Sequence, residues 1–260
     1  MVFNYYTNYY KWKGIFNMKV GVQFYSFKPE IDSGGFDKAL NMAARCGVEG
    51  VELFSLYDIP AITYRKALNE AGVVCYGTHN HLSPLINDLD GVMAYNYTLG
   101  NPMVICHYLT AEERGTRDKW LFAAESINKA AAILKRNGFD FSYHNHDFEF
   151  GEVFDGECGM DIILGNTDPH LVGIELHIGQ LPRFGLDMAE YIKKLGRRLK
   201  VLHVHTFQRD GESFDSSPAI TAAKALDVEW AIVENVFTAP TDIEAVKKSI
   251  GIIRDLTRGL

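Results

Sequence analysis

The sequence predicts a single (β/α)8 barrel, and three observations support this fold. Short apolar runs alternate with longer segments of helical pattern eight times from Val20 onward. The chain has 260 residues, close to the usual size of such a barrel. Its 47% hydrophobic and 23% charged residues are typical of a globular protein. A doubly wound open sheet is the alternative, but no GxGxxG turn follows the first strand, and eight alternations favour closure.

Eight segments are expected to be strands, because each is short and apolar and is followed by a turn or a helical pattern. In chain order they are Val20–Phe24, Val51–Phe54, Val73–Gly77, Met103–His107, Phe139–Ser142, Leu171–His177, Lys200–His205 and Trp230–Glu234. Each of them is expected to run parallel to the others, since a helix returns the chain after each strand.

Helices are expected between and after these strands, and several end at a glycine. The expected helices are Gly35–Arg45, Ile59–Ala71, Pro84–Leu99, Arg117–Arg136, Met160–Gly165, Met188–Leu195, Pro218–Ala225 and Thr241–Thr257. Gly47 and Gly72 follow the first two helices, and Asn137-Gly138 follow the longest, as expected of residues that end a helix. A hairpin-like insert is expected around Glu152–Gly156.

Composition excludes some classes of protein. The net charge of −7 disfavours nonspecific attraction to phosphate backbones, so no nucleic-acid partner is expected. No run of about 18 apolar residues is present, so no membrane span is expected. The cysteines lack CxxC spacing and two of them lie in apolar strands, which favours reduced thiols and a cytoplasmic protein. These cysteines are Cys46, Cys75, Cys106 and Cys158.

Residues 1–17 are interpreted as an N-terminal extension, and residues 18–260 as one barrel domain. The first 17 residues lack the continuous apolar core of a signal peptide, and Met18 begins a natural first strand. The extension is rich in tyrosine and asparagine, and its aromatic residues could cap the bottom of the barrel or an oligomer interface. An alternative start of translation would explain it equally well.

The histidines collect at one face of the predicted barrel. Of the nine histidines, all but His170 lie at the C-terminal end of a predicted strand. They are His79, His81, His107, His144, His146, His177, His203 and His205. In a (β/α)8 barrel these strand ends open onto the face that carries the active site. This placement is the strongest physical signal of function in the sequence.

Three of these groups are His-x-His pairs, whose two members share one side of an extended strand. Imidazoles crowded into the barrel mouth cannot all be protonated, and a divalent metal would bind them as neutral ligands. Carboxylates are available at Glu52, Glu149 and Glu234. The pattern therefore predicts a metal centre, or a site that moves protons, at the C-terminal face.

Four stretches resemble the sugar phosphate isomerase/epimerase family, which belongs to the xylose isomerase-like barrels. They are GVQFYS at 21–26, YHNHDFEF at 143–150, VLHVH at 201–205 and IVE at 232–234. The resemblance runs from about Val20 to the end of the chain, and YHNHDFEF is its most specific part. The same barrels include apurinic endonucleases, but the acidic chain lacks an obvious lysine and arginine stripe for phosphates.

The resemblance implies one divalent ion held by groups from strands five to eight. His203 and Glu234 match the histidine and glutamate ligands of strands seven and eight. His177 stands where the family pattern has an aspartate, and His144 or Glu149 would supply the ligand of strand five. The lysine-aspartate that usually follows the seventh-strand histidine reads His205-Thr206 here. The ion would be manganese, zinc, cobalt or magnesium, and a histidine-rich site favours the transition metals over magnesium.

A metal-dependent isomerase or epimerase of a sugar or sugar phosphate is the expected function. The ion would act as a Lewis acid, and proton transfer next to a carbonyl would proceed through an enediolate. Glu149 or His146 would remove the proton, and a second group would return it; Glu234 is a further candidate catalytic residue. The expected substrate-binding residues are Gln23, Glu52, His79, His81, His107, His205 and Arg183.

Two other readings use the same residues. A metal-dependent lyase or hydrolase acting on oxidised glycosides would abstract the same proton and then lose a leaving group. A non-catalytic barrel that binds sugar or metal becomes the better reading if His177 disrupts the site. The partner is expected to be a small carbohydrate, and the resemblance also suggests a homo-oligomer.

Overall fold

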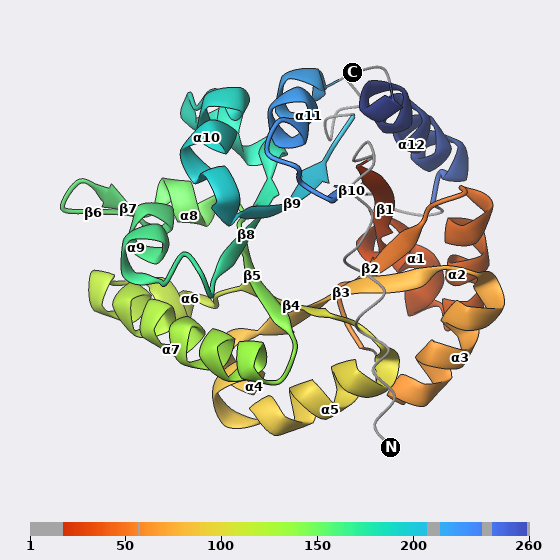
Figure 1. The fold of residues 1–260 in the computed structure, drawn as a ribbon, viewed down its shortest axis with the longest axis horizontal. Helices are drawn as coiled ribbons and strands as arrows, with labels where there is room; N and C mark the ends of the chain where they lie inside the picture. The colour runs from red at the N-terminus through yellow and green to blue at the C-terminus, as the bar shows by residue number, and fades with distance from the viewer. Residues whose placement is uncertain (1–17, 57, 207–213, 236–240, 259–260) are drawn as a thin grey trace.

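Eight parallel strands close into a barrel in the computed structural model, which describes residues 18–56, 58–206, 214–235 and 241–258. Around the barrel the strands follow the order β1-β10-β9-β8-β5-β4-β3-β2 (Figure 1). Their bounds are β1 (Lys19–Gln23), β2 (Gly50–Leu53), β3 (Val74–His81), β4 (Met103–Tyr108), β5 (Asp140–His144), β8 (Gly173–His177), β9 (Leu199–Val204) and β10 (Trp230–Val233). The predicted (β/α)8 barrel is confirmed. The predicted extension at residues 1–17 lies outside the described residues.

A ring of helices surrounds the barrel (Figure 1). The longer helices are α2 (Phe36–Arg45), α3 (Ala61–Ala71), α4 (Leu82–Asn87), α5 (Leu89–Leu99), α7 (Arg117–Arg136), α9 (Gly159–Asn166), α10 (Met188–Leu195), α11 (Ser217–Lys224) and α12 (Ile243–Arg258). Short turns of helix connect them at η1 (Phe24–Phe27), α1 (Lys28–Asp32), α6 (Ala111–Arg114), α8 (Phe148–Gly151), η2 (Ile178–Phe184) and η3 (Gly196–Arg198). The expected insert is a small antiparallel hairpin of β6 (Val153–Phe154) and β7 (Glu157–Cys158).

One expected helix is two helices in the structure. The sequence predicted a continuous helix over Pro84–Leu99, but α4 ends at Asn87 and α5 begins at Leu89. Between them Asp88 leaves the helical conformation, with φ −147° and ψ 47°. Its side chain accepts a hydrogen bond from the backbone N–H of Gly91 and so caps α5. An aspartate that caps a helix competes with the helix interior for the same backbone groups, which explains the break.

Large apolar side chains fill the N-terminal half of the barrel interior. Tyr76, Val201, Trp230 and Ile232 form this cluster, and Met103 packs against it. The rings of Tyr76 and Trp230 are stacked, with centroids 4.9 Å apart. Fully burying a side chain of this size stabilises the fold by on the order of 2 kcal/mol. Because this end of the interior is filled, polar groups that point inward collect at the opposite, C-terminal end.

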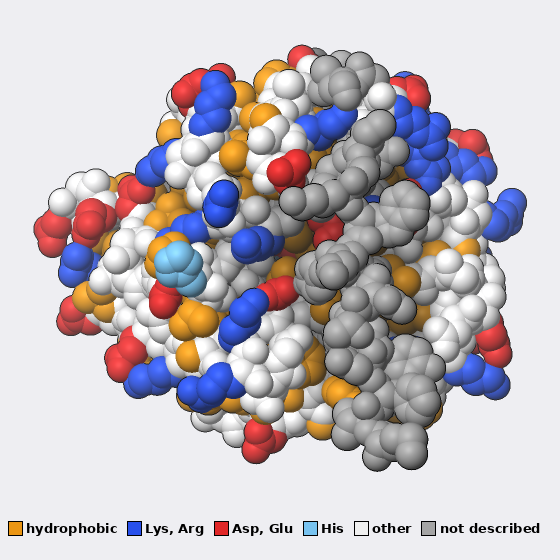
Figure 2. All heavy atoms as spheres, in the orientation of Figure 1, with side chains coloured by type: hydrophobic (Ala, Val, Ile, Leu, Met, Phe, Trp, Pro, Cys, Tyr) orange, Lys and Arg blue, Asp and Glu red, His pale blue; other side chains and the backbone are white. Residues whose placement is uncertain are grey.

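The outer surface carries charges of both signs. On the face shown in Figure 2, lysine and arginine side chains are interspersed with aspartate, glutamate and uncharged side chains. None of the described helices combines the length and the apolar composition needed to cross a membrane.

Candidate functional site

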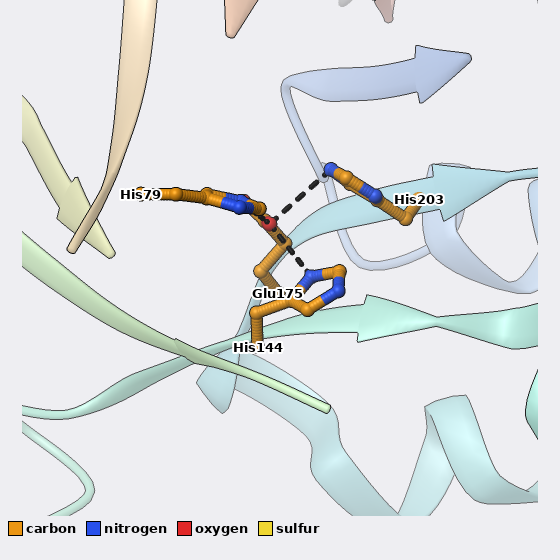
Figure 3. Close-up of side chains that lie close together, drawn as sticks. All are labelled: His79, His144, Glu175 and His203. Carbon is orange, nitrogen blue, oxygen red and sulfur yellow. Dashed lines mark hydrogen bonds and ion pairs between the residues drawn. The ribbon is translucent and has the colours of Figure 1, made fainter. Parts of the chain in front are cut away.

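Three imidazoles from three strands converge on one carboxylate at the C-terminal end of the barrel (Figure 3). Oε1 of Glu175 lies 2.8 Å from Nδ1 of His144, 3.0 Å from Nε2 of His79 and 3.2 Å from Nε2 of His203. All four residues are buried. Strand register explains part of this convergence, because His144 on β5 lies directly beside Glu175 on β8. These four residues are called the inner group below.

A second buried carboxylate, Glu52, borders the inner group. Its Oε1 lies 2.8 Å from Nε2 of His79 and 2.9 Å from Nε2 of His203. Gln23 is its neighbour in the β1–β2 register and donates its side-chain amide to the same oxygen. The other oxygen, Oε2 of Glu52, is buried and has no hydrogen-bond partner among the described residues.

The two carboxylates keep the nearest imidazoles charged when no other cation is bound. Burial lowers the pKa of His79, but Glu52 and Glu175 outweigh burial and raise this pKa to about 9. The pKa of His203 rises well above its ordinary value for the same reason, against the effect of burial. Burial and the charge of His203 lower the pKa of His144 to about 4, although Glu175 opposes them. His144 is therefore the neutral imidazole of the inner group.

A third carboxylate, Glu234, faces the other nitrogen of the His203 ring. Oε2 of Glu234, just past β10, is 3.6 Å from Nδ1 of His203 and 3.7 Å from Nδ1 of His177. His177 and His203 are neighbours in the β8–β9 register. Both Nδ1 atoms are buried and have no hydrogen-bond partner among the described residues. His177, His203 and Glu234 are called the outer group below.

His205 extends the outer group toward the opening of the barrel. Its Nε2 shares a hydrogen bond with Nε2 of His177 and lies 3.9 Å from Oε2 of Glu234. Burial raises the pKa of Glu234, but His203, His177 and His205 outweigh burial and hold this pKa well below its ordinary range. Burial and the charge of His205 lower the pKa of His177. In the outer group the carboxylate of Glu234 therefore lies beside the neutral imidazole of His177.

The predicted base candidates, Glu149 and His146, lie next to each other beyond the end of β5. Glu149 is buried and accepts hydrogen bonds from the Tyr143 hydroxyl at 2.8 Å and from the His146 backbone N–H at 2.7 Å. Burial raises the pKa of Glu149 to about 8. The ring of His146 stacks on Phe148, and its centroid is 5.0 Å from that of His144. Burial lowers the pKa of His146 to about 3.

Three more of the predicted residues lie around these groups or at the surface. The ring of His107 stacks on His79 at 4.8 Å, and its Nδ1 contacts the backbone oxygen of Asn80. His81 is exposed, with its ring 4.7 Å from that of His107. Arg183 is exposed and lies 3.5 Å from the Asp147 carboxylate. His107 therefore borders the inner group, whereas His81 and Arg183 belong to the rim.

The structure brings most of the predicted residues together. It also adds Glu175, which was not among the residues predicted from the sequence. Glu175 joins three of the predicted histidines, although only His177 of the same strand was singled out. The signal was available, because residues two apart on a strand point to the same side. Glu149 belongs to neither group, since Tyr143 and His146 hold its two carboxylate oxygens.

Comparisons with known proteins agree with this architecture. No model of a protein family matches the chain. An inosose dehydratase from Clostridium perfringens is 30% identical over 93 residues, which are 36% of this chain and 30% of that protein. The match thus spans less than a third of the curated relative's length.

Solved structures match over almost the whole chain. A sugar phosphate isomerase/epimerase from Parabacteroides distasonis has a TM-score of 0.78 at 23% identity, covering 92% of this chain and 94% of that one. A D-allulose 3-epimerase from Methylomonas sp., solved with D-allulose, has a TM-score of 0.71 at 15% identity, covering 92% and 97%. The chain therefore has the xylose isomerase-like (β/α)8 fold of the solved sugar phosphate isomerases/epimerases.

Proposed function

We propose that the protein is a metal-dependent isomerase or epimerase of a sugar or sugar phosphate, acting by proton transfer next to a carbonyl through an enediolate. The observation that carries this proposal is the outer group. Two buried imidazole nitrogens, Nδ1 of His177 and Nδ1 of His203, face one carboxylate oxygen of Glu234 without a hydrogen-bond partner among the described residues. Unpaired buried nitrogens beside a carboxylate fit the ligand set of a divalent ion.

His177, His203 and Glu234 would hold the ion. A divalent ion bound there supplies Lewis acidity, which makes the C–H next to a substrate carbonyl more acidic. Two imidazoles and one carboxylate favour zinc, manganese or cobalt over magnesium, which prefers oxygen ligands. His144 and Glu149, the other expected ligands, are engaged elsewhere by Glu175 and by Tyr143.

His146 is our candidate for the base that removes the proton. Burial lowers its pKa to about 3, so the imidazole is unprotonated at neutral pH. Its Nδ1 has no hydrogen-bond partner among the described residues. Glu149 is assigned a positioning role, because its carboxylate holds the His146 backbone N–H at 2.7 Å.

Glu234 is our candidate for the second proton-transfer group. Its Oε2 faces the two Nδ1 atoms, so Oε1 is the carboxylate oxygen assigned to proton transfer. Hydroxyl groups of the substrate would contact His205, His107 and His81, which lie toward the opening of the barrel. Gln23, Glu52 and His79 are joined by polar contacts and would form the floor of the substrate pocket. Arg183, at the surface, would meet a phosphate if the substrate carries one.

Deuterium exchange tests this proposal. Candidate ketoses incubated with the protein and zinc, manganese or cobalt in deuterated water should take up deuterium at the carbon next to the carbonyl. Glu234→Gln should slow this exchange by about 10²-fold or more, because it removes both a ligand of the proposed ion and the second proton-transfer group. Glu190→Gln, on the exposed side of α10, should exchange like the wild type. Absence of exchange with every candidate, or unchanged exchange in Glu234→Gln, contradicts the proposal.

A dehydratase is the second candidate function, and the local match to inosose dehydratase favours it. The same base would remove the same proton, and a neighbouring hydroxyl would then leave as water. Mass spectrometry separates the two functions, because an epimer or isomer keeps the mass of the substrate and a dehydration product loses water. A product of lower mass from a keto-polyol, with no epimer formed, would replace the first proposal by the second.

A further inference from the structure

We infer that the inner group, His79, His144, Glu175 and His203, is a second divalent-cation site that shares the His203 ring with the outer group. This inference concerns residues that the proposed function does not use as ligands of the catalytic ion, apart from His203. It does not depend on the proposed reaction.

The first argument is the supply of donors in the inner group. One ligand atom from each of the four residues lies within 4.8 Å of the other three, and all four residues are buried. They come from β3, β5, β8 and β9, so the fold rather than a flexible loop positions them. Three imidazoles and one carboxylate form a suitable four-coordinate set for zinc or another first-row divalent ion.

The second argument is that the imidazole nitrogens of the inner group compete for too few hydrogen-bond acceptors. Three imidazole nitrogens lie within 3.2 Å of the single oxygen Oε1 of Glu175. A carboxylate oxygen offers about two lone-pair directions, so one of the three nitrogens lacks a well-directed acceptor there. His79 and His203 each present the same nitrogen, Nε2, to both Glu175 and Glu52. A cation would take one lone pair from each of the four residues, with the Nε2 protons of His79 and His203 released to solvent, and so remove this competition.

The third argument is an unpaired carboxylate oxygen beside the group. Oε2 of Glu52 is buried and has no hydrogen-bond partner among the described residues, while Oε1 of Glu52 contacts two of the proposed ligands. An unpaired buried carboxylate oxygen is destabilising in a protein interior, and a positive ion next to it offsets this effect. Glu52 thus supplies negative charge next to the cation without being one of its four ligands.

The fourth argument is the support behind the proposed ligands. The Tyr76 hydroxyl donates a hydrogen bond of 2.9 Å to Oε2 of Glu175, which leaves Oε1 for the cation. Gln23 donates to Oε1 of Glu52, the carboxylate beside the group. Hydrogen bonds of this kind orient metal ligands in proteins. Because all four ligands are buried, the geometry points to a closed, structural ion, whereas the outer group lies nearer the opening of the barrel.

His203 links the two sites. Its Nε2 belongs to the inner group and its Nδ1 to the outer group, so with both ions bound the ring would bridge them as an imidazolate, with both ring protons released to solvent. Variants at His79 or Glu175 change only the inner group, and variants at Glu234 change only the outer group. The two sites can therefore be removed separately.

Zinc stoichiometry is the test, and metal-free full-length protein is the material. Wild type should bind about two equivalents of zinc in a titration followed by elemental analysis. His79→Gln and Glu175→Gln should each bind about one, and Glu234→Gln should also bind about one. His170→Gln changes a histidine in the exposed loop before β8 and should keep both. Cobalt provides a second readout, since Glu234→Gln and His79→Gln should each lose the share of the visible absorption that the removed site contributes to the wild-type spectrum.

The outcomes separate this inference from the proposed function. One equivalent that survives in His79→Gln but is lost in Glu234→Gln overturns the inner site and leaves the outer site standing. One equivalent that is lost in His79→Gln but survives in Glu234→Gln supports the inner site and contradicts the proposed catalytic ion. No bound zinc overturns both. If the inner variants do not fold by circular dichroism, the wild-type titration decides, because a single equivalent with no second binding step contradicts the inference.

Discussion

Nδ1 of His203 lies 3.6 Å from Oε2 of Glu234, while Nε2 of the same ring faces Glu175 and Glu52 on its other side. One imidazole therefore stands between two groups of ligands. This arrangement depends on β8, β9 and β10 being adjacent in the barrel.

Replacing His203 should affect both groups at once. His203→Gln removes a ligand atom from the inner group and one from the outer group, so we expect zinc binding to fall to less than half an equivalent. Activity should fall by about 10²-fold or more, because the proposed catalytic ion is lost. Elemental analysis and steady-state kinetics measure these effects, with His170→Gln as the matched control. Full metal content in His203→Gln would contradict the shared-ring arrangement.

The buried carboxyl of Glu149 should make stability depend on pH. Burial raises its pKa from the ordinary value of 4.5 to about 8 in the folded protein, so the folded state binds a proton that the unfolded state releases. This contribution is present below about pH 4.5 and is lost as the pH rises through about 8. We expect Glu149 to lower the free energy of unfolding of the wild type progressively across this window, relative to a variant with no carboxyl at this position.

The variant Glu149→Gln should lack the contribution of this carboxyl to the pH dependence, because glutamine does not titrate. Urea unfolding at several pH values measures the difference between the two proteins. Glu190→Gln, which changes an exposed glutamate, should keep the wild-type slope. Parallel pH profiles for wild type and Glu149→Gln would show that this carboxyl has an ordinary pKa in the folded protein.

Changing His177 should alter the choice of metal. His177→Asp replaces an imidazole nitrogen with a carboxylate oxygen. Oxygen ligands suit magnesium and manganese, so activity with magnesium should rise about 10-fold relative to activity with zinc. Kinetics with each ion measure the ratio, which His170→Asp should leave unchanged. An unchanged ratio in His177→Asp would exclude His177 as a ligand of the active ion.

The Tyr76 hydroxyl should matter more for metal binding than an ordinary tyrosine hydroxyl. Tyr76→Phe removes the donor to Oε2 of Glu175 and should lower stability by about 1–3 kcal/mol, because a buried acceptor loses its partner. The affinity of the inner site for zinc should fall about 10- to 100-fold. Tyr95→Phe is the matched control, since the Tyr95 hydroxyl donates to the backbone oxygen of Ile59.

The control separates a general loss of stability from a local one. Tyr95→Phe should lower stability without weakening zinc binding, whereas Tyr76→Phe should do both. Unfolding in urea and competition with a chromophoric chelator measure the two quantities. Equal zinc affinity in the two variants would mean that Tyr76 does not support a metal ligand.

The barrel could be predicted from the sequence because its signals are local. Each strand is a short apolar run and each helix a longer amphipathic one, and the turns between them do not depend on distant residues. The bounds of α7 and α10 match the prediction, whereas Asp88 divides the helix predicted over Pro84–Leu99. The parallel topology also brings the C-terminal strand ends to one face, so the gathering of the histidines there was predictable.

Only the tertiary structure decided how these side chains pair. Glu175 lies two residues before His177 and points inward with it, but its three imidazole neighbours come from other strands that no local pattern connects. Glu149 turns to Tyr143 instead of the barrel mouth because α8 begins directly after Asp147. The alternation of a strand determines which side a residue faces, but it does not determine which distant carboxylate an imidazole meets. Those pairings depend on register around the closed barrel, which the whole chain builds.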